Sequence, residues 1–120
     1  MIRFIFIYRH FFSQKMPFFI YIISYLYMKS VINNIDCFVI DEIIKEEKIS
    51  VIYQKMNENG KYYNKNIIIN EKFKNKDFEI KIIIHELFHF FEEKFKKSSM
   101  KIISESAARI FEKYIYYKFS

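Results

Sequence analysis

The sequence is poor in the residues that build several common kinds of site. Its 120 residues include one cysteine, one glycine, one proline and no tryptophan. A single cysteine excludes a disulfide framework within the chain and any metal site made only of cysteines. A single glycine excludes a phosphate-binding loop and a dinucleotide-binding fingerprint, because both need several glycines. The length suggests one domain, and 52% apolar residues are enough for a core, so we expect a folded chain.

The net charge of +6 does not by itself indicate a nucleic-acid-binding protein. Residues 1–30 hold four of the 20 basic residues and none of the 14 acidic residues, so most of the basic excess lies there. In the rest of the chain, lysines alternate with acidic residues. That pattern is typical of a solvated surface rather than of a phosphate-binding patch. We therefore expect no nucleic-acid partner.

Residues 1–30 form a hydrophobic, basic leader with 20 apolar residues. Its longest apolar stretch is 18–28, which is shorter than the roughly 18 residues of a confident membrane span. Three interpretations stay open: a membrane anchor or surface helix, a signal peptide without a clear cleavage site, or a gene-model artefact if translation starts at Met28. The expected organisation is this leader at 1–30 followed by one domain at 31–120.

After the leader, the sequence patterns predict an α+β domain. Apolar residues at helical spacing after Asp36, a plausible N-cap, predict a first helix that includes Cys37. Asn59-Gly60 is a strong hairpin signal, because both residues tolerate positive φ. Asp77 can cap a long helix, which Ser98-Ser99 interrupts. The predicted elements are a helix, two hairpin strands, a long helix and a C-terminal helix, at 36–47, 49–56, 62–70, 77–97 and 100–117.

The predicted long helix carries the motif with chemical potential, His85-Glu86-Leu87-Phe88-His89. Residues four apart on a helix lie on one face about one turn apart, so His85 and His89 can share one Zn²⁺. Glu86 lies about 100° round the helix from His85, where a general base for a zinc-activated water belongs. The helix also has a continuous apolar face that should pack on the core, formed by Ile80, Ile83, Ile84, Leu87 and Phe91.

A catalytic zinc site needs a third protein ligand and leaves the fourth position to water. Glu92 lies seven residues from His85, about 10.5 Å along the helix axis, which is too far to close the site. The last helix offers Glu105 and Glu112. We favour Glu105, because the neighbouring Ala107-Ala108, the only alanines in the chain, would permit close approach of the two helices.

The stretch 67–117 resembles the small zincin metallopeptidases of phage and prophage genomes, a glutamate-zincin type related to ImmA/IrrE-like peptidases. The resemblance rests on residues 82–89 and 105–111, separated by a short helical gap. It implies a minimal zincin-like domain that acts on a peptide or protein substrate, and we expect an intracellular, cytoplasmic location. It implies a catalytic Glu86 and three zinc ligands, His85, His89 and Glu105. Phe90 departs from the family, in which small residues are more usual at this position.

Other roles are open in the sequence. Residues 67–70 are either a sheet edge with which an extended peptide pairs or a plain strand. Tyr62, Tyr63 and Arg109 are candidates to stabilise an oxyanion, and Arg109 could instead orient Glu105 from one turn away. Two rival functions also stay open. One is a zinc-binding regulatory domain with little turnover, and the other is a membrane-associated interaction protein that acts through its leader.

Overall fold

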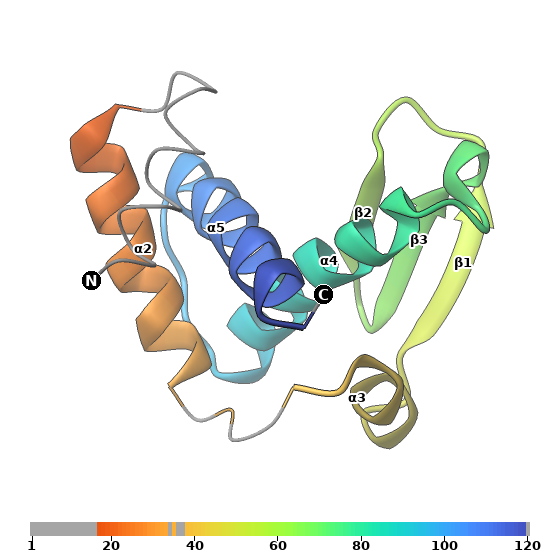
Figure 1. The fold of residues 1–120 in the computed structure, drawn as a ribbon. Coiled ribbons are helices and arrows are strands. Elements are labelled where there is room, and N and C mark those ends of the chain that lie inside the picture. Colours follow the sequence, from red (N-terminus) through yellow and green to blue (C-terminus); the bar gives the residue numbers. More distant parts are fainter. Residues whose placement is uncertain (1–16, 34, 36–37, 120) are drawn as a thin grey trace.

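The structure is a computed structural model that describes residues 17–33, 35 and 38–119, with side chains to residue 116. Within these ranges the chain forms four α-helices, a 3₁₀ turn and a three-stranded sheet (Figure 1). The predicted α+β class is therefore confirmed. In chain order the elements are α2 (Phe18–Ile32), α3 (Ile40–Glu46), β1 (Ser50–Gln54), β2 (Gly60–Tyr63), β3 (Asn66–Asn70), η1 (Glu71–Phe73), α4 (Phe78–Lys94) and α5 (Lys101–Phe119).

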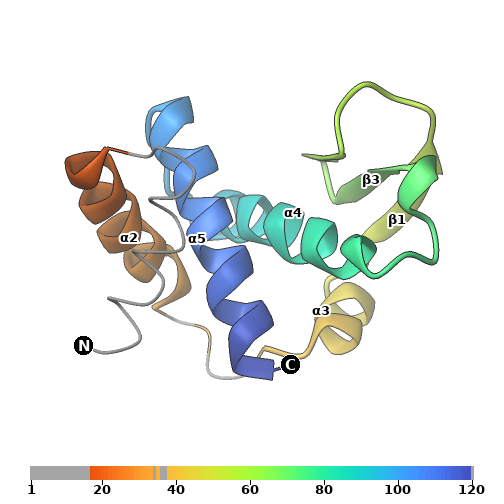
Figure 2. The same ribbon diagram turned by 45° about the horizontal axis from the view of Figure 1, so that its top comes forward.

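Helix α4 lies at the centre of the molecule, with the sheet on one side and helices α2 and α5 on the other (Figure 1; Figure 2). Because it is covered from two sides, α4 buries more than the single apolar face predicted from its sequence. Ile82, Phe88 and Phe90 are buried in addition to the predicted Ile84, Leu87 and Phe91, whereas Ile80 at the start of the helix is exposed. The aromatic side chains of α4 therefore join the two halves of the core.

The sheet has the strand order β1–β3–β2, so the predicted hairpin is wrong in its strand pairing and in its turn. β1 runs parallel to β3, and the antiparallel hairpin is formed by β2 and β3. Its turn is Asn64-Lys65, whose φ values of 47° and 63° suit a two-residue turn of type I′. This turn splits the predicted strand 62–70. The segment before β2 is held instead by buried Asn70, whose side-chain amide donates to Met56 O (2.7 Å) and Glu58 O (3.0 Å).

Gly60 has a different role from the predicted one. It lies at the start of β2 and does not have a positive φ. A Cβ atom at this position would clash with Ile82 Cγ2 and would lie 3.3 Å from Glu86 Oε2. The only glycine of the chain therefore permits the close approach of β2 to α4, beside the predicted catalytic residue.

The helix ends differ modestly from the predicted ones. Asp77 is the N-cap residue of α4, as predicted, although its side chain makes no capping hydrogen bond. Helix α3 begins at Ile40 after Val39, which cannot cap through its side chain, and is shorter than the predicted 36–47. The predicted cap Asp36 and Cys37 lie outside the described residues.

Helix α2 crosses the predicted boundary at residue 30 and packs along α5 (Figure 1). Four of its side chains are buried in the core: Tyr21, Ser24, Met28 and Val31. Four apolar side chains on its other side are exposed: Phe18, Phe19, Ile23 and Leu26. None of the helices in the described ranges has the length and hydropathy needed to cross a membrane.

Candidate metal centre

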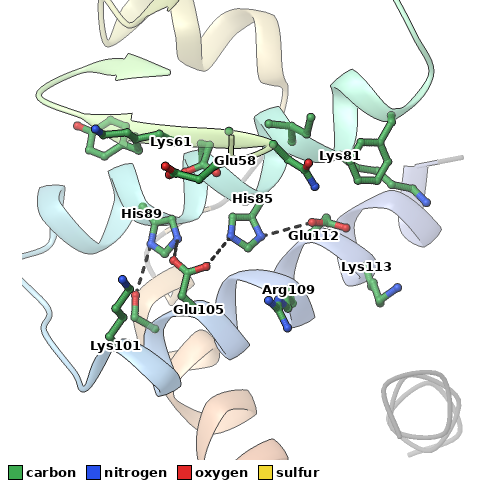
Figure 3. A pocket seen from close by; sticks show the side chains of 17 residues that line it. Glu58, Lys61, Lys81, His85, His89, Lys101, Glu105, Arg109, Glu112 and Lys113 are labelled. Carbon is green, nitrogen blue, oxygen red and sulfur yellow. Dashed lines mark hydrogen bonds and ion pairs between the residues drawn. The ribbon is translucent and has the colours of Figure 1, made fainter. Parts of the chain in front are cut away.

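Helix α4 presents His85 and His89 on the side that faces helix α5. Their ring centroids lie 5.2 Å apart, and the side chains are 15% and 17% exposed. Glu105, in the second turn of α5, reaches both rings (Figure 3). Its Oε2 lies 3.3 Å from His85 Nε2, and its Oε1 lies 3.0 Å from His89 Nε2. One potential ligand atom from each residue lies within 4.8 Å of the others, so the structure brings the three predicted ligands together.

The other nitrogen of each imidazole faces a second carboxylate. His89 Nδ1 lies 2.7 Å from Glu92 Oε1, and His85 Nδ1 lies 3.4 Å from Glu112 Oε1. A carboxylate at Nδ1 fixes the orientation of the ring and leaves Nε2 to bind a metal. Glu112, the alternative third ligand in the sequence, therefore contacts His85 on the side opposite to Glu105 (Figure 3).

Glu92 is held in place by two hydroxyl groups. Ser104 Oγ donates to Glu92 Oε1 at 2.8 Å, and the Tyr27 hydroxyl donates to Glu92 Oε2 at 2.5 Å. Burial raises the pKa of Glu92, but hydrogen bonds from His89, Tyr27 and Ser104 outweigh it and bring the pKa below its ordinary value. Tyr27 belongs to α2, so a residue of the predicted leader supports a candidate metal ligand.

Opposite charges stabilise one another within the site. Close contacts with the His85 and His89 rings hold the pKa of Glu105 well below its usual range. Burial opposes protonation of the two rings, but their hydrogen bonds to carboxylates outweigh it and raise both pKa values to about 9. One divalent cation at the Nε2 atoms would supply the two positive charges that protonation of the two rings otherwise supplies.

The donor set fits a zinc ion. Two imidazole nitrogens and one carboxylate oxygen are the protein ligands of one common class of catalytic zinc site, which leaves a position for water. His89 Nε2 is buried and has no hydrogen-bond partner of good geometry among the described residues. A buried imidazole nitrogen in that state, next to Glu105, is suited to bind a metal.

Glu86 lies on the β2 side of the histidines. It is 6% exposed, and its Oε2 lies against the backbone of Gly60. Burial is the largest effect on this carboxyl and raises its pKa, although the charges of His85 and His89 act in the opposite direction. A raised pKa suits a carboxylate that accepts a proton and returns it at near-neutral pH.

The site opens into a cavity of about 1010 Å³ that is lined by α4, α5 and β2. The three candidate ligands and Glu86 all line this cavity, together with Gly60, Lys61 and Tyr62 of β2; Figure 3 shows Lys61 on β2, on the other side of the histidines from Glu105. A buried carboxylate and three potential ligands thus share one space with room for a substrate.

The candidate oxyanion stabilisers have different surroundings. Tyr62 lines the cavity, but its hydroxyl donates to Glu93 Oε1 at 2.9 Å and accepts from Lys65 N at 3.0 Å. Tyr63 is 68% exposed and lies outside the cavity lining. Arg109 is exposed and lines the cavity, so it is the member of this group with a polar end near the site.

Of the two interpretations that stay open for residues 67–70 in the sequence, the free sheet edge is excluded and the plain strand is confirmed. This segment is β3, the central strand, which pairs with β1 on one side and with β2 on the other. The strand beside the cavity is β2, which has β3 as its only strand neighbour in the described part of the chain.

Sequence reasoning missed the residues that support the ligands. The spacing of three between His89 and Glu92 on a helix is a signal that could have revealed this pair. Ser104 stands directly before Glu105 in the sequence, so its hydroxyl could have been considered as a further group near the ligands. Tyr27 is 65 residues from Glu92, and no local pattern connects the two.

In comparisons with known proteins, no family model, curated protein or solved structure matches this chain.

Proposed function

We propose that the protein is a zinc-dependent metallopeptidase with a minimal zincin-like fold. The observation that carries the proposal is the convergence of His85 Nε2, His89 Nε2 and the Glu105 carboxylate, with Glu86 buried in the same cavity. The ligands come from two helices and line the cavity, and within the described residues no fourth ligand joins them. An open position of this kind distinguishes catalytic from purely structural zinc sites.

The proposed mechanism assigns His85, His89 and Glu105 to hold zinc. When bound, zinc supplies Lewis-acid chemistry, which lowers the pKa of water and polarises a carbonyl group. Glu86 accepts the proton of the attacking water and then passes it to the amine that leaves when the peptide bond breaks. The buried position of Glu86 keeps its carboxyl available for both transfers, because its raised pKa lies nearer to neutral pH than that of an exposed glutamate.

The support for a peptide substrate is strand β2. Its unpaired side can accept an extended chain through backbone hydrogen bonds, which is how peptides add to a sheet edge. Gly60 lets β2 lie close to Glu86, so a chain paired with β2 would pass beside the proposed base. The resemblance to phage and prophage peptidases supports an intracellular location.

Glu86→Gln tests the proposed function most directly. The zinc content of the purified full chain is measured by emission spectrometry, and hydrolysis is measured on a peptide library by mass spectrometry. We expect the variant to keep one zinc per chain and to lose hydrolysis, because glutamine cannot accept the proton. Glu71→Gln, at an exposed position in η1 outside the cavity lining, is the matched control and should keep both properties.

The same experiment distinguishes a peptidase from the main alternative, a zinc-binding regulatory domain. A wild-type chain that binds one zinc and hydrolyses no peptide would favour a zinc-binding regulatory domain. Hydrolysis that survives Glu86→Gln would exclude Glu86 as the base. A chain without stoichiometric zinc would refute the metal centre itself.

The exposed apolar side of α2 favours a second candidate, association with a membrane surface. Phe18, Phe19, Ile23 and Leu26 are each about half exposed or more. Such a helix side can insert at the boundary between lipid headgroups and acyl chains. Co-sedimentation with phosphatidylcholine vesicles, compared between the wild type and Phe19→Ser/Leu26→Ser, tests this candidate. Equal sedimentation of the two proteins would contradict it.

A further inference from the structure

The cavity is lined by more cationic than anionic side chains. Its cations are Lys61, Lys81, Lys101, Arg109 and Lys113. Its carboxylates are Glu58, Glu86, Glu105 and Glu112. Two of these carboxylates contact His85, and Glu86 is buried beside the candidate ligands, so Glu58 alone is not committed to the site.

Four of the cations occupy the same helix sides as the metal centre; Lys101 precedes Glu105 by four residues and lies toward His89 (Figure 3), and the other three lie in the opposite direction. Lys81 precedes His85 by four residues on α4, and Arg109 and Lys113 follow Glu105 by four and eight residues on α5. Residues at these spacings lie one or two turns apart on a common side of a helix. We refer to Lys81, Arg109 and Lys113 as the cationic cluster.

The contacts between α4 and α5 put the cationic cluster beyond His85. Going back along α4, His89 contacts Glu105, and His85 contacts both Glu105 and Glu112. One turn further back, the Lys81 ammonium lies 4.4 Å from the ring centroid of Tyr116 on α5. The two helices therefore run in opposite directions along the site. Figure 3 shows Lys81 and Lys113 on the same side of His85 as Glu112.

Like charges brought together in this way repel one another. Burial lowers the pKa of Lys113, the charge of Glu112 raises it, and the positive charge of Lys81 lowers it. Within the described part of the chain, no ion pair neutralises Lys81 or Arg109. A bound anion would supply a counter-charge to Lys81 and Arg109, and guanidinium and ammonium groups are the usual partners of carboxylates.

We infer that the cationic cluster binds a carboxylate of the peptide substrate, so that the cavity selects acidic peptides. The inference rests on the proposed peptidase function. The cationic cluster lies one to two helical turns from the candidate metal ligands, which corresponds to about 5–11 Å along the helix axes. An extended peptide covers this distance in about two or three residues. The bound carboxylate is therefore an Asp or Glu side chain, or the C-terminus itself, two or three residues from the bond that is cleaved.

The test measures binding of defined peptides to the zinc-loaded full chain carrying Glu86→Gln, which should bind without hydrolysis. The probes are fluorescein-labelled (Ala-Glu)₄ and (Ala-Gln)₄, each with a free and an amidated C-terminus, followed by fluorescence polarisation. We expect amidated (Ala-Glu)₄ to bind at least about tenfold more tightly than amidated (Ala-Gln)₄ if side chains are read. If the C-terminus is read, amidation of (Ala-Gln)₄ should weaken binding by a similar factor.

Charge variants assign the effect to the cluster. Arg109→Gln/Lys113→Gln should weaken binding of the preferred peptide by about tenfold or more. Arg109→Gln alone, at an exposed position, should give a smaller loss with little effect on folding. Lys45→Gln/Lys55→Gln removes the same charge at exposed positions outside the cavity and should change binding little.

Two outcomes would overturn the inference. One is equal binding of all four peptides, and the other is an equal loss in the cluster variant and in the Lys45/Lys55 control. Failure of the proposed function gives a different result, because acidic peptides would then bind through the cluster while the wild type hydrolyses none of them. Conversely, hydrolysis without preference for acidic peptides would leave the peptidase and remove the subsite.

Discussion

The two histidines of the site have different surroundings although they lie one turn apart on one helix. At His89, the contact from Nδ1 to Glu92 is 2.7 Å, and Glu92 is buried and hydrogen-bonded by side chains of α2 and α5. At His85, the contact from Nδ1 to Glu112 is 3.4 Å, and Glu112 lines the cavity. One end of the site is thus closed by packed side chains, and the other borders the cavity.

The difference teaches how one small domain can combine preoriented candidate metal ligands with an accessible cavity. A ligand that is oriented by a short, buried hydrogen bond loses little freedom when the metal binds. At the His85 end it is the supporting carboxylate, Glu112, that borders the cavity across a longer contact, so the ring is held more loosely. We therefore expect the closed end to contribute more to zinc affinity, and the open end to contribute more to substrate recognition.

Glu105→Ala should have the largest effect, because Glu105 serves both ends of the site. Loss of a direct ligand should weaken zinc binding by more than about a hundredfold, the upper end of what losing a supporting carboxylate costs. Competition with a chromophoric chelator measures the affinity. Unchanged stoichiometry and affinity would show that the third ligand is another residue, with Glu112 as the next candidate.

Glu92→Gln and Glu112→Gln compare the two ends directly. Both keep the side-chain shape and remove the charge that orients a histidine. We expect Glu92→Gln to weaken zinc binding by about ten- to a hundredfold, and Glu112→Gln by about tenfold or less, because its contact is longer and less buried. Equal losses in the two variants, measured with the same chelator, would show that the two ends are equivalent.

The candidate ligands were predictable because helix geometry determines where they lie. A spacing of four puts His85 and His89 on one side of any α-helix, whatever the rest of the fold. Small residues beside Glu105 correctly favoured it over Glu112 as the carboxylate that faces both rings. These arguments need only local structure and the close approach of two helices.

The sheet was not predictable in the same way. Asn-Gly is a turn signal, but position 60 needs glycine for another reason: a side chain there would clash with α4. No local sequence pattern reveals that contact. Asn64-Lys65 forms the turn, although lysine rarely adopts positive φ. The observed pairing, in which β3 lies between β1 and β2, is stabilised by contacts between residues that are distant in sequence. The boundary predicted at residue 30 follows from charge and apolar content, and neither carries information on how α2 packs.

The pH dependence of stability provides a smaller test of the charges at the two histidines. In the folded chain without zinc, hydrogen bonds to carboxylates raise the pKa of His85 and His89 to about 9, above the roughly 6.5 of an unfolded chain. This contribution to stability is complete below about pH 6.5 and is lost as the pH rises through about 9. The melting temperature of chelator-treated protein should fall across this range.

Zinc should reverse that trend, because it binds neutral imidazoles and has fewer protons to displace at higher pH. The increase in melting temperature on adding zinc should therefore grow from pH 6.5 to 9. His85→Gln and His89→Gln should each remove part of the slope seen without zinc. A melting temperature that stays constant or rises over this range in chelator-treated wild type would contradict the assigned charges.

Tyr27→Phe should have the smallest effect and tests how far the closed end extends. The substitution removes the hydroxyl that donates to Glu92 and keeps the aromatic ring. That ring packs edge-on against Phe88, with the two ring centroids 6.2 Å apart. One lost hydrogen bond to a charged group two contacts from the metal should weaken zinc binding by about three- to tenfold with little loss of stability. Tyr63→Phe, at an exposed position outside the cavity, is the matched control. If Tyr27→Phe binds zinc as tightly as the control, α2 supports the core but not the metal centre, and the closed end stops at Glu92.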